Sequence, residues 1–197
     1  MKRRADAPRR GPIAAAIVRR AVAASVDRLA RHESAALGRG VEGVHQARVA
    51  IRRLRSDLRS FRDLVDARWS GSLRQELRWL GGELGAVRDL DVFIMRVTAA
   101  AKRAGANKDP GVAELLHAAR AARAQARKRL VKSMRSDRYA KLRDRLVQAA
   151  SAPSFTLASR LPAHDAFGPI IRRRMKRVRS AVDDLAPRPS MAALHRI

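Results

Sequence analysis

A run of basic residues repeats with helical spacing between positions 45 and 62. The six residues follow one another at intervals of three, four, three, four and three: His45, Arg48, Arg52, Arg55, Arg59 and Arg62. At about 100° per residue, this spacing places all six in a stripe roughly 100° wide on one face of an α-helix. The adjacent face carries the apolar residues Ile51, Leu54, Leu58, Phe61 and Val65. We therefore expect a helix that packs with one face and presents a straight row of positive charge on the next, a surface suited to a linear polyanion.

The whole chain is strongly basic. Its 197 residues include 44 Lys and Arg against 18 Asp and Glu, a formal net charge of +26. This imbalance indicates an acidic partner, because without one the apolar core alone must offset the repulsion among the positive charges. A generally arginine-rich proteome could explain the composition, but it does not explain the phasing of the basic row. The chain has no cysteine and no uncharged stretch long enough to span a membrane, a combination typical of a cytoplasmic protein.

Apolar periodicity predicts an all-α protein, a helical bundle without strands. We expect helices over residues 13–37, 41–65, 70 or 72 to about 106, 112–134, 136–150 and 169–186, with a loop over 152–166. The third helix carries a packing seam at alternating spacings of four and three, formed by Leu73, Leu77, Leu80, Leu84 and Val87. Residues 1–11 are expected to form a flexible basic arm, 12–135 a first helical bundle and 136–197 a partial second bundle.

The chain also contains an internal repeat. Gly11-Pro12-Ile13 precedes one expected helix and Gly168-Pro169-Ile170 precedes another. After each helix and a short break comes an apolar residue followed by histidine, at Val44-His45 and at Leu194-His195. This pattern indicates a duplicated four-helix unit whose second copy is incomplete. Coincidence between two helices rich in Ala and Arg is the alternative explanation.

The segment His45-x-x-Arg48-Val49-x-x-Arg52-Arg53-Leu54-Arg55 resembles the signature of the CHAD domain, the conserved histidine α-helical domain. Phe61, Leu84-Gly85 and Arg88-Asp89-Leu90-Asp91-Val92 match the next landmarks of that family at similar spacing. The resemblance implies two pseudo-symmetric four-helix bundles around a basic groove. It also implies binding of inorganic polyphosphate, association with polyphosphate granules, and a CYTH triphosphatase as a functional neighbour.

The candidate binding residues follow from the basic row and from this resemblance. We expect Arg48, Arg52, Arg55 and Arg59 to bind phosphate oxygens, with His45 at the mouth of the groove, because arginine stays charged and offers a planar fork of donors. Arg53 lies about 100° around the helix from Arg52 and is a less direct candidate. From the second bundle we expect contributions from Arg172, Lys176, Arg179 and His195. Alternatively, the arginines form a solvated face and pair with acids such as Asp57 or Asp63.

Three residues of the third helix are expected to orient the groove. They are Arg88, Asp89 and Asp91. Asp91 falls on the packing seam, where a buried carboxylate needs a cationic partner, so we expect it to hold a groove arginine. Asp89 and Asp91 could instead bind a metal for phosphate hydrolysis, but two carboxylates are weak support for a metal site. We predict no catalytic activity, no metal and no cofactor.

Noncatalytic polyphosphate binding is therefore the leading hypothesis, and three alternatives remain. The first is a nucleic-acid or ribosome binder, which the charge supports equally but the scarcity of aromatic residues does not. The second is a basic amphipathic protein at a membrane surface. The third is an accessory subunit of a phosphate-processing enzyme such as a CYTH-type triphosphatase or a polyphosphate kinase.

Overall fold

The computed structural model describes residues 12–38, 40–185 and 190–191, and its elements are helical. The order is α1 (Ala14–Leu37), α2 (Val41–Ser60), α3 (Ala67–Arg103), α4 (Pro110–Met134), α5 (Asp137–Ser151), the 3₁₀ helix η1 (Leu157–Arg160) and α6 (Ala163–Asp183). Within the described residues no β-strand forms beyond two isolated bridges. The predicted all-α fold is confirmed. The expected basic arm at 1–11 lies outside the described residues.

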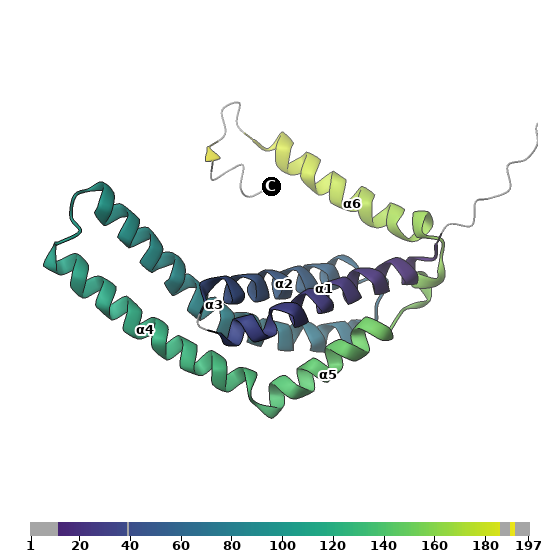
Figure 1. Ribbon diagram of the computed structural model, residues 1–197. Coiled ribbons are helices and arrows are strands. Elements are labelled where there is room, and N and C mark those ends of the chain that lie inside the picture. Colours follow the sequence, from purple (N-terminus) through teal and green to yellow (C-terminus); the bar gives the residue numbers. More distant parts are fainter. Residues whose placement is uncertain (1–11, 39, 186–189, 192–197) are drawn as a thin grey trace, which may run out of the picture.

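The core is formed mainly by α1, α2, α3 and α5, and the end of α4 and the first turn of α6 add residues to it. α1 packs along α2, α2 along the first half of α3, and α5 along α1 (Figure 1). The predicted seam of α3 is buried in full, and the apolar face of α2 is buried at Ile51, Leu54 and Leu58. Burying these leucine and isoleucine side chains contributes about 1.5–3 kcal/mol each, so the opposite faces of these helices are free to carry charge.

α5 also belongs to this core, although residues 136–197 were expected to form a partial second bundle. Its buried residues Tyr139, Leu142, Leu146 and Ala149 join the same apolar cluster as α1 and α2. The reason lies in the outer half of α3 and most of α4, which project from the core as a long hairpin (Figure 1). The chain returns to the bundle in the last turns of α4, where Leu130 and Met134 join the core, and Ser136 then caps α5 at the position expected from the sequence.

α3 begins at Ala67, before the expected start at 70 or 72, and α2 ends before its expected boundary. α2 ends at Ser60, not at 65, because Val65 pairs with Phe155 in an isolated bridge and the Asp66 amide donates to the Ser154 carbonyl at 2.9 Å. These long-range contacts replace helical ones. Arg62 consequently lies in the turn after α2, beyond the helical part of the basic row.

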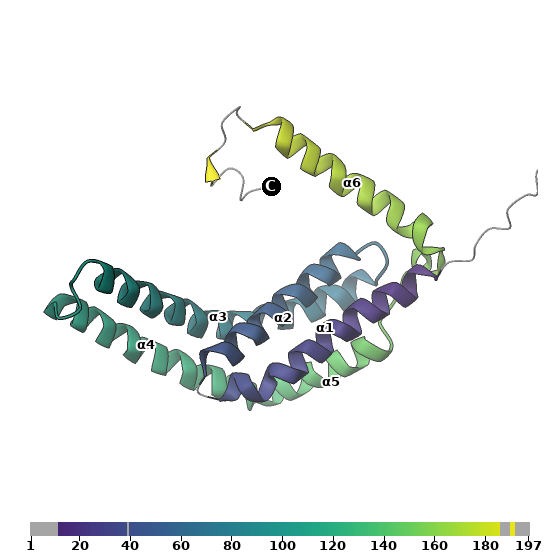
Figure 2. The same cartoon turned by 45° about the horizontal axis from the view of Figure 1, so that its top comes forward.

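α6 begins at Ala163, six residues before Pro169, where the helix was expected to start. Its first turn is anchored on the core by Ala166, which is buried, and by Phe167, which packs edge-on against Phe61 with ring centroids 5.9 Å apart. Beyond this anchor α6 runs separately from the bundle on the side of α2 (Figures 1 and 2). Apolar residues of its outer part are exposed: Ile171, Met175, Val178 and Val182.

Candidate functional site: a cationic cleft along α2

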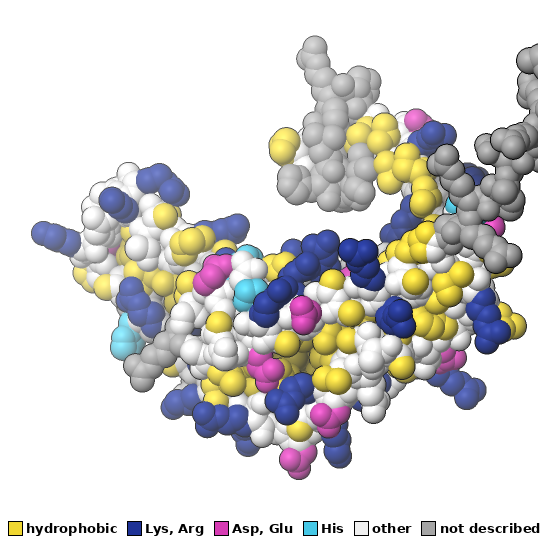
Figure 3. Space-filling view, turned by 45° about the vertical axis from the view of Figure 1, so that its right-hand side comes forward, with side chains coloured by type: hydrophobic (Ala, Val, Ile, Leu, Met, Phe, Trp, Pro, Cys, Tyr) yellow, Lys and Arg dark blue, Asp and Glu magenta, His cyan; other side chains and the backbone are white. Residues whose placement is uncertain are grey.

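α2 carries the helical part of the basic row on a face that other helices leave uncovered. Arg52 and Arg59 are exposed and Arg55 is half-buried, whereas Leu54 and Leu58 of the same helix are fully buried. Lys and Arg side chains gather in a band along the edge of the bundle that faces α6 (Figure 3). From Arg48 to Arg59 the row extends about 16 Å at 1.5 Å per residue.

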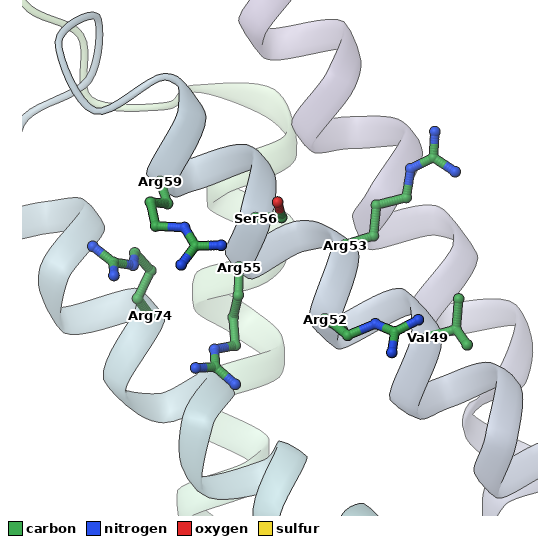
Figure 4. A pocket seen from close by; sticks show the side chains of 7 residues that line it. All are labelled: Val49, Arg52, Arg53, Arg55, Ser56, Arg59 and Arg74. Carbon is green, nitrogen blue, oxygen red and sulfur yellow. The ribbon is translucent and has the colours of Figure 1, made fainter. Parts of the chain in front are cut away.

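A cleft of about 570 Å³ opens beside this row, and we call it the α2 cleft. Its lining comes from α2 and from one residue of α3: Val49, Arg52, Arg53, Arg55, Ser56, Arg59 and Arg74. Arg59 and Arg74 approach the cleft from different helices, whereas Arg53 extends on the side away from them (Figure 4). Five arginines therefore line the cleft, and the Arg53 guanidinium extends away from those of Arg59 and Arg74.

These five arginines are not neutralised by the acids near them. Across the described ranges 12–38, 40–185 and 190–191, no carboxylate lies within ion-pair distance of Arg52, Arg53, Arg55, Arg59 or Arg74. Arg48, one turn before the cleft, is different, since its Nη2 lies 3.5 Å from Asp89 Oδ1. The alternative expectation that Asp57 pairs with the row does not hold among these residues, because Asp57 accepts a hydrogen bond from Ser25 at 2.9 Å.

Arginine side chains of α2 lie close to two glycines of α3. A Cβ on Gly85 would lie 3.5 Å from Arg48 Nε, and one on Gly81 would lie 3.3 Å from Ile51 and 3.9 Å from Arg55 Nη1. The two glycines are one helical turn apart, so they form a strip of bare backbone on which the arginine side chains lie. Of these contacts only that of Gly81 with Ile51 is tight, so the arginine side chains lie against α3 at ordinary contact distance.

The three predicted orienting residues have different surroundings. Asp89 pairs with Arg48 of the row, with Oδ1 3.5 Å from Arg48 Nη2, and its orienting role stays a prediction. Asp91 does not hold a groove arginine, because its Oδ1 accepts a hydrogen bond from Arg123 Nε of α4. Near Asp91 the buried face of α3 packs against α4 and is no longer covered by α2. Asp91 therefore meets an arginine of α4 in place of one from the basic row. Arg88 is half-buried and forms no ion pair with the described acids.

Burial around Asp91 also affects α4. Arg127 lies close by, donates from Nη2 to the Ala36 carbonyl at 2.9 Å, and has a buried Nη1 without a partner in the described part of the chain. Burial lowers the pKa of Arg127 below its ordinary value, with the positive charge of Arg123 acting in the same direction. This cluster ties α4 to α3 and α1 and lies apart from the α2 cleft.

α6 presents a different set of basic residues to α2 from the one expected. Arg172, Lys176 and Arg179 line a separate hollow on α6 with Met175, so the structure does not place them in the groove beside α2. Arg173, Arg174 and Arg177 face α2 instead, in a hollow of about 260 Å³ shared with Arg59 and Arg62. The start of α6 at Ala163 and its anchor at Phe167 set which face of α6 lies toward α2. The spacing of residues within α6 does not encode this. His45 is half-buried near the start of α2, and His195 lies outside the described residues.

Sequence analysis missed four arginines that border these hollows: Arg74, Arg173, Arg174 and Arg177. Arg74 follows the buried Leu73, so its phase puts it at the edge of the seam, but only the packing of α2 on α3 brings it to the cleft. In the described part of the chain no three His, Asp or Glu residues gather as a metal site would require. No helix in the same part is long and apolar enough to cross a membrane.

Comparison with known proteins places this arrangement in a family. The chain is similar to PptA from Streptomyces chartreusis, with a TM-score of 0.73 and 23% identity over 89% of this chain and 62% of that one. It is also similar to the CHAD domain from the plant Ricinus communis, with a TM-score of 0.68 and 23% identity over 100% of this chain and 64% of that one. The chain thus spans a little under two thirds of either structure, and no curated protein matches it. The CHAD domain model matches residues 20–197, and the chain therefore belongs to the CHAD domain family, which is associated with polyphosphate binding.

Proposed function

We propose that this protein binds inorganic polyphosphate in the α2 cleft, without catalysing its turnover. The observation that carries the proposal is the set of five arginines around one open cleft, none of them paired with a described carboxylate. Holding such charges close together is unfavourable unless an anion joins them. Arg52, Arg55 and Arg59 rise about 4.5–6 Å from one to the next, so each guanidinium can meet a phosphate at intervals along an extended chain, with Arg48 and His45 continuing the row.

Nucleic acid is a weaker candidate ligand. Single strands bind through bases stacked on exposed aromatic rings beside a basic track. The aromatic residues near the bundle are already engaged: Phe61 packs on Phe167, Trp79 lies under the Arg138 guanidinium at 4.1 Å, and Tyr139 is buried. Phe93 is exposed on the α3–α4 hairpin, but it lines neither basic hollow. A basic surface that offers no aromatic ring for base stacking is better suited to a polyanion that has no bases.

The test is the salt dependence of polyphosphate binding. Each neutralised phosphate should contribute about −0.7 to the slope of log K against log salt, by analogy with single-stranded nucleic acids. Replacing Arg52 and Arg55 together by Ala should weaken binding and flatten the slope by about one to two units. The matched control is Arg19→Ala with Arg20→Ala, which removes two exposed arginines of α1 and the same charge. If the slope of log K against log salt is the same in the two double variants, Arg52 and Arg55 do not contact the bound phosphates.

Competition separates the two ligands. Long-chain polyphosphate should displace single-stranded RNA from the protein, and RNA should not displace polyphosphate. The reverse order would favour the nucleic-acid function.

A binding module of this kind could bring polyphosphate to an enzyme such as a CYTH-type triphosphatase or a polyphosphate kinase. We place it in the cytoplasm, at polyphosphate granules. A pull-down from cells and co-localisation with a polyphosphate stain test these assignments. Loss of co-localisation in the Arg52/Arg55 variant is the expected result.

A further inference from the structure

The cationic surface does not stop at the end of α2. The hollow of about 260 Å³ between the end of α2 and α6, here the α2–α6 hollow, shares Arg59 with the α2 cleft. Its basic lining comes from both sides: Arg59 and Arg62, then Arg173, Arg174 and Arg177. A polyanion lying along α2 would therefore reach a second group of arginines beyond Arg59.

One acid lies inside this second group. Asp63 is the single carboxylate among the described residues that line either hollow. Its Oδ2 accepts a hydrogen bond from Arg173 Nη2 at 2.5 Å, and its Oδ1 lies 3.4 Å from Arg62 Nε. The carboxylate is thus paired with two of the cations that a phosphate would otherwise meet.

The backbone fixes Asp63 in this position. Leu64 and Val65, which follow it, are buried in the core. The Thr156 hydroxyl donates to the Asp63 carbonyl at 3.0 Å and the Thr156 amide donates to the Leu64 carbonyl at 3.1 Å. The side chain itself is 43% exposed, so solvent and anions can reach it. Asp63 is therefore held at the hollow by the fold, whatever its carboxylate pairs with.

We propose that Asp63 is a specificity-determining residue that acts as an internal competitor for phosphate in the α2–α6 hollow. The proposal rests on the proposed function of the α2 cleft. A short anion arriving alone must displace the carboxylate from Arg173 and Arg62 and bear its repulsion. A long chain already held on Arg52, Arg55 and Arg59 presents its next phosphates at high effective concentration and can displace it. Asp63 thus keeps the second hollow closed to short anions and open to chains bound in the first.

The experiment compares the full chain with Asp63→Asn by calorimetric titration with tripolyphosphate and with long-chain polyphosphate. In the wild type, tripolyphosphate should fill one site, the α2 cleft. In Asp63→Asn the α2–α6 hollow should become a second site, so the stoichiometry rises from about one to about two. Long-chain polyphosphate should bind the variant roughly three- to tenfold more tightly, with unchanged stoichiometry, as expected for removal of a partly exposed ion-pair competitor.

Asp27→Asn is the matched control. Asp27 is an exposed carboxylate on α1 that also pairs with an arginine, Arg31, at 3.9 Å, and it lines a different hollow. It changes the net charge by the same amount, so equal gains in both variants would show a general charge effect and overturn the proposal. Asp63→Ala should behave as Asp63→Asn does, and melting curves check that both variants fold.

The outcomes separate this inference from the proposed function. If the wild type binds long-chain polyphosphate and Asp63→Asn gains neither affinity nor a second tripolyphosphate site, the role of Asp63 is refuted and the proposed function stands. If neither protein binds long-chain polyphosphate, the proposed function fails and the role of Asp63 fails with it.

Discussion

At the scale of single residues, Asp91 is a buried charge that joins α3 to α4. Its side chain is 3% exposed, and its Oδ1 pairs with Arg123, whose side chain is 25% exposed. Its Oδ2 has no hydrogen-bond partner in the described part of the chain. A carboxylate in this setting is tolerated because the guanidinium offsets part of the cost of removing it from water.

Arg123→Ala should therefore be strongly destabilising. The substitution leaves Asp91 buried without its hydrogen-bonded guanidinium, and Arg127 remains as the nearby cation, so we expect the free energy of unfolding to fall by about 3 kcal/mol. Urea denaturation followed by circular dichroism measures this change. Arg120→Ala is the control, since Arg120 is exposed on the same helix. If both variants unfold at the same urea concentration, the pair does not stabilise the hairpin.

At the scale of elements, the approach of α1 and α2 is set by Gly43. A Cβ added there would lie 2.2 Å from the Ala35 carbonyl oxygen and 2.3 Å from its carbon. These are backbone atoms, which cannot rotate away as a side chain can. The close contact brings the start of α2 onto α1 near Ala35.

Gly43→Ala should force the two helices apart and destabilise the fold by about 1–3 kcal/mol, the usual cost of overpacking. Gly82→Ala is the matched control, because Gly82 lies within α3 and a Cβ there meets nothing within 4 Å. That variant should be more stable by about 0.5–1 kcal/mol, since alanine favours the helix. Thermal melting of both variants checks the prediction, which fails if Gly43→Ala melts at or above the wild-type temperature.

At the scale of the whole molecule, the net charge of +26 opposes folding. Repulsion among unpaired arginines is screened by salt and removed by a bound polyanion. We expect the melting temperature of the free protein to rise with ionic strength. Polyphosphate at about 100 times its Kd should add roughly 2.7 kcal/mol to the free energy of unfolding.

Scanning calorimetry at matched ionic strength measures this stabilisation. The Arg52/Arg55 double variant serves as the control and should gain less from polyphosphate than the wild type. A melting temperature that stays constant or falls on addition of polyphosphate would contradict binding to the folded state.

The sequence by itself determined the helical class, the packing seam of α3 and the phase of the basic row from Arg48 to Arg59. All three depend on the period of the α-helix, which acts over a few residues and can be counted along the chain. The motif around His45 further identified the family that the domain comparison shows.

Only the tertiary structure decided which side chains meet. It paired Asp91 with Arg123, brought Arg74 to the α2 cleft and ended α2 at Ser60. It packed α5 into the same core as α1 and α2. It also turned Arg173, Arg174 and Arg177 toward α2 in place of Arg172, Lys176 and Arg179. These outcomes depend on the rotation and crossing of helices far apart in the chain, which close packing of large and small side chains sets.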